Sequence, residues 1–328
     1  NTYGLVKDMI ESNSIVQLMD TISTGETREI PALLVAAGPS LDKNVKELKK
    51  AKGKAFLLVV DTALNTVFEH GIVPDLTISI DSRKPLKLFQ NQEFENIPIV
   101  LSMNSNTEVV KKNHARHFYE IDDQTYVKRS IEKLGKKSMQ LPTGGSVANN
   151  ALSLLYEMGF RTIILVGQDL AYPGGVEHTE AAYGKGNNKV DTNKKTYIEV
   201  EDNFGNMVMT ETNMNMYRKW IEQYIAAYDD LKVINATEGG AKIAGTEFVT
   251  LSEAIGRYCK KEFDAAELLD KQPYFTEEER KQFVGEIRKM PEKIEELGKL
   301  IQEAQKLYRK VDSLNEKGKH NSMQMKKA

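Results

Sequence analysis

Short apolar runs that alternate with helix-like segments are the feature that most constrains the fold of this chain. Five runs have the length and composition of buried strands, at residues 32–37, 55–60, 76–80, 97–102 and 162–166. Segments with helical character separate them, including 43–50, 63–70 and 147–158. Strands joined through helices are typical of a parallel sheet that is covered on both faces. We therefore expect an α/β fold with a doubly wound, mostly parallel, Rossmann-like sheet.

The regions outside this alternation divide the chain into three parts. Residues 1–30 have the pattern of an N-terminal helix and a polar linker, and residues 31–255 contain the α/β domain. An insertion at about 180–211 holds Gly184, Gly186, Asn187 and Asn188, which indicate a mobile loop, and then a β-hairpin. Residues 256–328 are charged and helical, and we expect the tail after Lys317 to be disordered.

A heptad pattern runs through the C-terminal region. Its apolar residues are spaced alternately by four and three positions, at Phe283, Ile287, Met290, Ile294, Leu297, Ile301, Ala304, Tyr308 and Val311. Such a seam needs a partner helix, which either a hairpin within this chain or a second copy of the chain would supply. Pro291 is expected to divide the segment, because proline is tolerated in the first turn of a helix.

Composition excludes several classes of function. A formal net charge of −2 over 328 residues gives no basic footprint for general nucleic-acid binding. Cys259 is the sole cysteine, which excludes an internal disulfide and a cysteine-based zinc cluster. The sequence holds no apolar run of membrane-spanning length, so a cytoplasmic protein without a membrane span is expected. The chain begins with Asn1, as a piece of a longer protein would.

A Thr-Gly-Gly-Ser turn precedes the apolar helix at 147–158. Gly144 and Gly145 expose backbone N–H groups at the positive end of the helix dipole, while Thr143 and Ser146 contribute hydroxyls. This pattern predicts an anion site. A simple helix cap is the alternative, although a cap requires only one such residue.

The strand at 162–166 ends in polar, ionisable residues. Gln168 and Asp169 follow it directly, and Tyr172 and His178 lie a few residues further on. Open α/β sheets bind ligands just beyond the carboxyl ends of their strands. Tyr172 could donate to a leaving phosphate, and His178 could exchange protons near neutral pH or lie solvated at the surface. His114 and His117 are expected to be surface residues.

Other strand ends carry weaker signals. Gly38 and Ser40 are expected in a turn that allows close approach of a phosphate. The alternative is a purely structural turn between a strand and a helix. Asp61 and Asp81 follow neighbouring strands, where they could hold Mg²⁺, bind a ribose or fix loops. Glu238 lies in a glycine-rich turn that forms either another wall of the cleft or a structural turn.

These motifs occur together in an order that resembles the bacterial motility accessory factor family. The segments are AAGPSL, VVDTALNTVFEHGIVPD, TGGSVANNA, GQDLAY and NATEGGAKI, within residues 30–260. That family is described as flagellin glycosyltransferases with a 6-hydroxymethylpterin diphosphokinase-like domain. More distantly, GPSL, the TGG-helix-strand unit and GQDLAY are similar to the GNGPSL, TSG and GIDFY elements of Campylobacter-type sialyltransferases.

The resemblance implies a sialyltransferase-like nucleotide-sugar domain and a specific chemistry. The donor would be a CMP-activated nonulosonic acid of the sialic, pseudaminic or legionaminic type, and the acceptor a Ser or Thr hydroxyl of flagellin. No metal and no cofactor are implied, because the CMP-sugar is a substrate. The C-terminal helices would allow a homo-oligomer.

The motifs and the resemblance together give the candidate site residues. Catalytic roles would belong to His178, Tyr172 and Asp169. Contacts to the nucleotide and donor would come from Gly38, Pro39, Ser40, Asp61, Asp81, Thr143, Gly144, Gly145, Ser146, Gln168 and Glu238. The match departs from the sialyltransferases at His178, where they carry a second Tyr, and no histidine occupies the later loop. His178 would then either activate the acceptor hydroxyl or stabilise the leaving phosphate.

Two alternatives stay open. The segment ALNTVFEHGIVPDLTISIDS is similar to the GIxPDxxxxDxDS segment of thiamine and 6-hydroxymethylpterin diphosphokinases, in which carboxylates hold Mg²⁺ with ATP. That reading gives a diphosphokinase for a pterin-like alcohol, with Asp61 and Asp81 as metal ligands, although Asp81 is the only Asp left in the carboxylate-rich ending. The second alternative is a non-catalytic assembly factor that binds flagellin through its helical tail.

Overall fold

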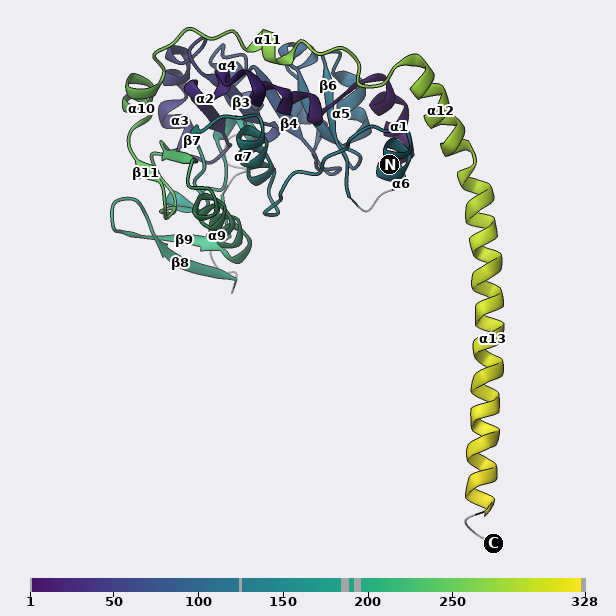
Figure 1. Cartoon of the computed structure of the whole chain (residues 1–328). Coiled ribbons are helices and arrows are strands. Elements are labelled where there is room, and N and C mark those ends of the chain that lie inside the picture. The colour runs from purple at the N-terminus through teal and green to yellow at the C-terminus, as the bar shows by residue number, and fades with distance from the viewer. Residues whose placement is uncertain (1, 124–125, 184–188, 192–195, 326–328) are drawn as a thin grey trace.

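The computed structural model describes residues 2–123, 126–183, 189–191 and 196–325. These residues form a nine-stranded sheet in the order β1-β6-β5-β4-β3-β2-β7-β10-β11, and every neighbouring pair in it is parallel. Figure 1 shows the sheet with helices packed around it. Its strands are β1 (Asn13–Ser14), β2 (Ala32–Val35), β3 (Phe56–Val60), β4 (Leu76–Ser79), β5 (Ile99–Ser102), β6 (His117–Glu120), β7 (Thr162–Val166), β10 (Lys232–Asn235) and β11 (Glu247–Phe248).

The order of the strands reverses at the middle of the sheet. The chain runs outward from β2 through β3, β4, β5 and β6, returns to place β7 on the other side of β2, and then continues to β10 and β11. Val35 therefore pairs with Val59 of β3 on one side and with Val166 of β7 on the other. Such a reversal opens a crevice at the carboxyl ends of the two central strands.

Apolar side chains on both faces hold the sheet in place. Residues of β2, β3, β5 and β6 are buried at every position, as expected of parallel strands covered by helices. The helices (η marks the 3₁₀ type) are α1 (Thr2–Glu11), η1 (Ile15–Thr24), α2 (Glu26–Glu29), α3 (Leu41–Asn44), η2 (Val45–Lys50), η3 (Asp61–Ala63), α4 (Leu64–Glu69), η4 (Leu86–Phe89), η5 (Gln92–Asn96), α5 (Thr107–Lys112), α6 (Tyr126–Lys133), α7 (Val147–Glu157), η6 (Pro173–Gly175), α8 (Glu180–Tyr183), α9 (Thr212–Ala227), α10 (Leu251–Tyr258), α11 (Ala265–Leu269), α12 (Glu277–Arg288) and α13 (Met290–Met325).

The α/β, doubly wound prediction is confirmed, and all five expected strands are present. The sequence pattern missed β6, which carries a His and a Glu, and the prediction that His117 lies at the surface was wrong. The His117 ring is buried, its Nδ1 lies 2.7 Å from Asp8 Oδ2, and its Nε2 lies 3.2 Å from the Asn113 carbonyl oxygen. His117 therefore joins α1 to the edge of the sheet.

The N-terminal segment is more ordered than a helix and linker. After α1, the two residues of β1 pair with Phe118 and Tyr119 of β6, and η1 follows directly. Leu5, Ile15 and Leu18 lie in the main core, so this segment covers one end of the sheet.

The insertion contains the expected hairpin. Strand β8 (Tyr197–Glu201) pairs with β9 (Met207–Glu211) in antiparallel register, and Gly205 in the turn adopts a φ of 84°. The predicted mobile loop at Gly184, Gly186, Asn187 and Asn188 lies outside the described residues. Helix α9 follows the hairpin and packs against α7, on the same side of the body as the hairpin in Figure 1.

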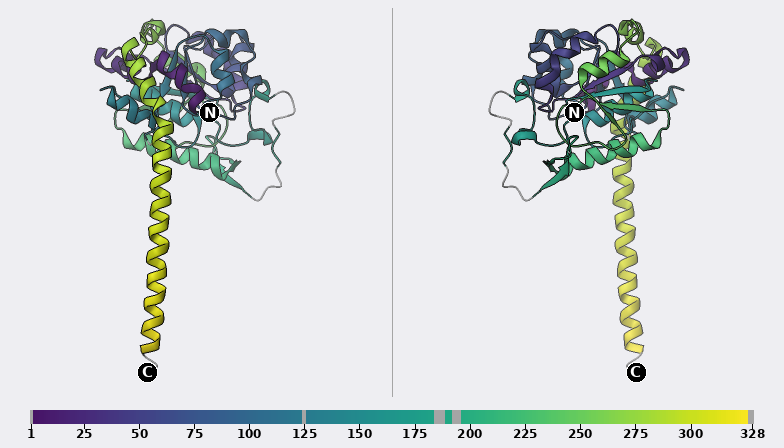
Figure 2. Two further views of the ribbon diagram at one scale, coloured as in Figure 1. Left: turned by 90° about the vertical axis from the view of Figure 1, so that its right-hand side faces the viewer. Right: turned by 90° about the vertical axis from the view of Figure 1, so that its left-hand side faces the viewer.

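The C-terminal region divides at a different place from the one predicted. Phe263, Leu269 and Phe275 are buried in the main core, so residues beyond 255 still belong to the body. Helix α13 then projects away from it as a single rod in every view (Figures 1 and 2). Pro291 lies at the start of α13, as expected. The helix continues past Lys317 to Met325, where a disordered tail was expected.

Among the residues that the structure describes, none of the helices combines the length and the apolar character needed to span a bilayer.

Candidate functional site

A cavity of about 330 Å³ opens at the carboxyl edge of the sheet, where the strand order reverses. Its walls come from the turns after β2, β3, β4 and β7, from the start of α7 and from α9. The lining residues are Ala36, Ala37, Gly38, Val60, Asp61, Thr62, Asp81, Lys84, Gly145, Ser146, Val147, Ala148, Gly167, Gln168, Asp169, Leu170, Ala171, Glu177, His178, Met214 and Tyr217. The cavity thus occupies the position where α/β sheets of this type bind ligands.

Hydrogen bonds join the turns that form the floor of this cavity. The Gly38 N–H donates to the Gly167 carbonyl at 2.7 Å, which couples the ends of β2 and β7. The Ser40 hydroxyl and N–H both donate to Asp169 Oδ2, at 2.7 and 3.2 Å. The Asp169 carbonyl accepts from the Ala241 N–H at 2.7 Å, which adds the turn after β10. The floor is therefore held by the backbone as well as by side chains.

Only glycine fits at position 38. A Cβ atom there would lie 2.0 Å from Asp169 Oδ2 and 2.5 Å from the Gly167 carbonyl oxygen. The glycine of the GPSL motif is thus explained by the close approach of two turns.

Asp169 is buried, and its carboxyl is a weaker acid than usual. Burial raises the pKa of this carboxyl to about 6, although the hydrogen bonds from Ser40 and the charge of Lys43 act in the opposite direction. Oδ2 carries the bonds to Ser40, whereas Oδ1 has no hydrogen-bond partner among the described residues. Asp169 lines the cavity and also clamps the turn after β2.

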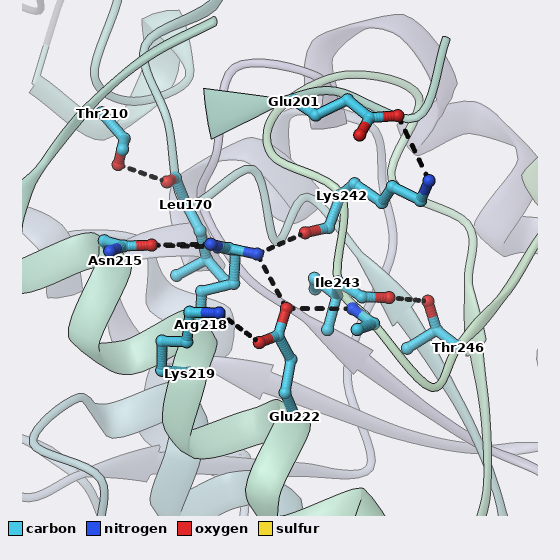
Figure 3. A network of polar contacts seen from close by, with 11 residues as sticks. Leu170, Glu201, Thr210, Asn215, Arg218, Lys219, Glu222, Lys242, Ile243 and Thr246 are labelled. Carbon is cyan, nitrogen blue, oxygen red and sulfur yellow. Dashed lines mark hydrogen bonds and ion pairs between the residues drawn. The ribbon is translucent and has the colours of Figure 1, made fainter. Parts of the chain in front are cut away.

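Leu170 has a strained backbone at the cavity wall. Its φ is 49°, in the left-handed region that non-glycine residues rarely adopt. The Thr210 hydroxyl of β9 donates to its carbonyl at 2.7 Å, as Figure 3 shows. This contact couples the hairpin to the end of β7.

A network centred on Arg218 fixes α9 beside the cavity (Figure 3). The guanidinium of Arg218 contacts Glu222 at 2.7 Å and donates to the Lys242 carbonyl at 3.0 Å. The Ala244 N–H donates to the same carboxylate of Glu222 at 3.0 Å. Helix α9 is thereby tied to the turn after β10, and this places Tyr217 in the cavity wall.

The N-terminus of α7 faces the cavity. Gly145 adopts a φ of 91°, and Ser146 caps the helix by accepting from the Asn149 N–H at 3.2 Å. Val147 and Ala148 follow in the first turn, where backbone N–H groups have no partner within the helix. All four residues line the cavity, so the predicted anion-binding geometry is available there.

Lys84 brings a positive charge to the same cavity. Its Nζ lies 2.9 Å from Asp61 Oδ1 and 2.8 Å from Thr62 Oγ1. Asp61 is fully buried, and its other oxygen accepts from the Ser79 hydroxyl at 2.9 Å. Of the described residues that line the cavity, Lys84 is the one Lys or Arg.

His178 lines the same cavity, next to Glu177. The imidazole Nε2 is 3.8 Å from Glu177 Oε1, and the ring also contacts the Ala37 carbonyl. Burial lowers the pKa of His178, and the charge of Lys84 lowers it further, while Glu177 and Asp61 raise it. The ring is therefore favoured in its neutral form at neutral pH, in which one nitrogen can accept a proton.

Several predicted residues do not line this cavity. The Tyr172 hydroxyl is turned to Glu211 Oε2 at 3.1 Å, and burial and that contact raise the pKa of Tyr172. Glu238 accepts from Asn44 and from the Leu251 N–H. The remaining residues outside the lining are Pro39, Ser40, Thr143 and Gly144. Tyr172 and Glu238 thus connect elements around the site.

Sequence reasoning missed Lys84, Glu177, Met214 and Tyr217. Lys84 lies only three residues after Asp81, but no local pattern links it to Asp61 on the preceding strand. Met214 and Tyr217 reach the cavity through the placement of α9, which follows the insertion.

The donor set does not fit the two-carboxylate magnesium site of the diphosphokinase reading. Asp61 is engaged by Lys84, Thr62 and Ser79, whereas Asp81 accepts from the Arg83 N–H at 2.8 Å. Within the described part of the chain, no group of three His, Cys, Asp or Glu side chains could hold a metal ion.

Sequence comparisons find a matching family and two distant relatives of this chain. The family model described as 6-hydroxymethylpterin diphosphokinase MptE-like matches residues 1–175. An uncharacterized protein of Treponema pallidum is 22% identical over 35% of this chain and 37% of its own length. A 6-hydroxymethyl-7,8-dihydropterin pyrophosphokinase of Methanocaldococcus jannaschii is 29% identical over 34% of this chain and 51% of its own length. The chain therefore spans about two fifths to one half of these relatives.

A solved structure has a similar fold. The MAf glycosyltransferase from Magnetospirillum magneticum superimposes with a TM-score of 0.55 at 16% identity, over 85% of this chain and 42% of that one. At this identity the likeness concerns the fold, which is the α/β fold expected from the sequence. Together with the family match, it confirms the family resemblance drawn from the motifs.

Proposed function

The chain belongs to the 6-hydroxymethylpterin diphosphokinase MptE-like family, and from this premise we propose that it is a glycosyltransferase. It would move a nonulosonic acid from a CMP-sugar to a Ser or Thr hydroxyl of flagellin. The observation that carries the proposal is the convergence of the α7 N-terminus, Lys84 and His178 on one cavity. The fold that the chain shares with a protein titled as a glycosyltransferase supports it.

In this proposal the phosphate of CMP binds between the α7 N-terminus and Lys84, which line the same cavity. The first-turn N–H groups of α7 and the positive end of its dipole favour an anion. An ammonium group has three N–H donors, and the described residues Asp61 and Thr62 take two of those of Lys84. The third remains for a phosphate oxygen, and the contact with Asp61 fixes the direction of the lysine.

His178 then accepts the proton of the acceptor. The hydroxyl oxygen attacks the anomeric carbon while the bond from that carbon to the CMP phosphate breaks. The hydroxyl proton passes to His178, and CMP leaves with the bonding electrons as a phosphate anion. Lys84 and the α7 N–H groups stabilise the charge that develops on this phosphate.

The second candidate is a diphosphokinase for a pterin-like alcohol. The family description and the Methanocaldococcus jannaschii relative favour it. The engagement of Asp61 with Lys84 weighs against it, because that carboxylate would have to serve as a metal ligand.

Nucleotide binding separates these functions. We would titrate the chain with CMP, CTP and ATP, each with and without Mg²⁺, and follow its thermal midpoint, since a ligand stabilises the folded state by mass action. The glycosyltransferase predicts binding of CMP and CTP without metal. Binding of ATP only with Mg²⁺ would favour the diphosphokinase, and no binding of any nucleotide would favour a non-catalytic flagellin-binding factor.

Replacement of Lys84 tests the phosphate site directly. We expect Lys84→Met to weaken CMP binding by roughly 10- to 100-fold, because a charge-assisted contact to phosphate contributes roughly 1.5–3 kcal/mol. Lys87→Met is the control, since Lys87 lies three residues further on in η4, is exposed and does not line the cavity. Equal CMP affinity in the two variants would contradict the proposed phosphate site.

The proposal includes the setting of the reaction. Flagellin would be met in the cytoplasm, with the CMP-sugar as substrate and no resident cofactor. Association through α13 into a homo-oligomer belongs to the same proposal.

A further inference from the structure

A second, smaller cavity lies next to the first on the same edge of the sheet. Its volume is about 220 Å³, and it is formed by the carboxyl ends of β4, β5 and β6, the segment before α7 and α7 itself. The lining residues are Ile80, Ser102, Met103, Asn104, Glu120, Asp122, Gln140, Thr143 and Asn150. No residue of this set was assigned to a function except Thr143.

The two cavities are neighbours along the chain at two places. Ile80 lines the second cavity and Asp81 lines the first. Thr143 lines the second and Gly145 the first, and the Gly145 N–H donates to the Thr143 hydroxyl at 3.3 Å. The Thr-Gly-Gly-Ser turn therefore forms part of the wall between them.

Glu120 is the central group of the second cavity. It is the last residue of β6 and is only 7% exposed, yet its Oε2 has no hydrogen-bond partner among the described residues. Burial raises the pKa of this carboxyl to about 7, and the nearby Asp122 acts in the same direction. Hydrogen bonds from the Leu141 N–H and from Asn150 oppose this shift. A buried oxygen without a partner is costly, so a ligand that satisfies it would bind favourably.

Asn150 is held in one orientation beside Glu120. The Thr143 hydroxyl donates to Asn150 Oδ1 at 2.8 Å, so the amide NH₂ group is directed the other way, toward Glu120. Asn150 is itself buried on α7. One oxygen of Glu120 is thereby fixed, while the other is buried without a hydrogen-bond partner among the described residues, in a side chain that lines the cavity.

The chemistry of the lining selects against anions. Two carboxyl groups, three carboxamides and two hydroxyls surround the space, and the residues that line it include neither Lys nor Arg. A phosphate or carboxylate would meet only like charge and neutral dipoles. An uncharged hydroxyl can donate to Glu120 and accept from an amide, as the lining requires.

We propose that this second cavity is a binding subsite for an uncharged, hydroxyl-bearing group, with Glu120 as its main hydrogen-bond partner. In this it extends the proposed glycosyl transfer, since the first cavity takes the anionic nucleotide and the second takes the hydroxylated partner. The hydroxyl comes from the part of a sugar ring that is remote from the carboxylate of a nonulosonic acid, or from a Ser or Thr side chain, and the test distinguishes these sources.

Binding is measured with matched probes by ligand-observed saturation-transfer NMR on the full chain. One pair is methyl α-glucopyranoside and the corresponding methyl glucuronide, which differ in charge. The other pair is N-acetyl-threonine methylamide and N-acetyl-valine methylamide, which differ in the hydroxyl. We expect the neutral or hydroxylated member of at least one pair to bind at least fivefold more tightly than its counterpart. The pair that shows this discrimination identifies a sugar or a side chain as the source.

Substitutions assign any binding to Glu120. Glu120→Met keeps the length of the side chain but removes both oxygens, and it should lower the affinity for the probe at least tenfold. Glu120→Gln keeps one acceptor and should restore part of the affinity. Glu157→Met is the control, because Glu157 lies on the same α7 helix as Asn150, has a pKa that burial raises, and lines neither cavity. Circular dichroism confirms that each variant is folded.

The proposal is overturned if neither pair discriminates, or if Glu120→Met binds the probes as tightly as the parent. CMP titration of the same variants keeps this result separate from the proposed function. Loss of probe binding with CMP binding intact supports the subsite. Probe binding without any CMP binding would support the subsite and contradict the glycosyltransferase proposal.

Discussion

At the scale of single residues, the close contact between Gly38 and Asp169 shows how little space separates the two central turns. We predict that Gly38→Ala destabilises the protein by about 1–3 kcal/mol, because its Cβ would overlap a carboxylate and a carbonyl oxygen. Gly256→Ala is the control, since a Cβ there meets nothing within 4 Å and a helical Gly→Ala change adds about 0.5–1 kcal/mol of stability. Urea unfolding measures both, and equal effects would refute the steric explanation.

Glu120 predicts a pH dependence of stability. Its pKa rises from an ordinary value of 4.5 to about 7 in the folded state, so the unfolded chain loses the proton first as pH increases. The free energy of unfolding should therefore fall between these two pH values, by up to about 3 kcal/mol.

Glu120→Gln removes this titration. Relative to the parent, the variant should gain stability as pH rises from 5 to 7.5, and urea unfolding at both pH values measures the gain. A constant difference between parent and variant across this range would contradict the assignment.

The role of a residue was predictable from the sequence where that role depends only on its neighbours along the chain. Ser146 as a helix cap and Gly145 at a positive φ follow from the Thr-Gly-Gly-Ser turn alone. The pairing of Asp61 with Lys84 was not predictable, because it joins the ends of two strands through tertiary structure. The same is true of Tyr172, whose hydroxyl binds Glu211 in the hairpin.

At the scale of elements, apolar patterning decided what could be predicted. Central strands such as β3 and β7 are almost entirely apolar and were located within two residues. Strand β6 reads HFYE, and its polar residues conceal from the sequence pattern a strand that is buried, in part by α1 and η1. Strand β1, with two residues, is too short to give any periodic signal.

Removal of α13 should leave the body intact. The apolar side chains of this helix are exposed, with Leu297 at 56% and Leu307 at 65%, so they add little to the core. We expect a chain that ends at Arg288 to unfold within about 2 °C of the thermal midpoint of the parent. Loss of exposed residues changes the free energy of unfolding by about 0.5 kcal/mol or less, which corresponds to a shift of that size. A large fall in the midpoint, measured by circular dichroism, would show that α13 packs against the body.

At the scale of the whole molecule, the unpaired seam of α13 predicts self-association. The helix of 36 residues extends for about 54 Å and carries Ile294, Leu297 and Ile301 on one side. The described residues do not form the alternative, a helical hairpin within the chain, because α13 leaves the body as a single helix (Figures 1 and 2).

Light scattering after size-exclusion chromatography tests this prediction. The parent should exceed the mass of one chain, and the double variant Leu297→Asp and Ile301→Asp should return to it, because charges in a coiled-coil seam are strongly unfavourable. Lys299→Asp, on the polar face beside Glu295, is the control and should stay associated. A parent that runs as one chain at all concentrations would contradict the prediction.

The first and last segments of the body are bonded to each other, which has a consequence for how the chain folds. The Tyr274 N–H donates to the Ser12 carbonyl at 3.0 Å, and the Asn13 amide donates to the Gln272 carbonyl at 2.7 Å. These contacts close a loop of nearly the entire body, and contacts so distant in sequence form late and slow the folding reaction. During synthesis, β1 can pair with β6 as soon as residues 117–120 are made, whereas the bonds of Ser12 and Asn13 to the last segment form only after residues near 275 are made.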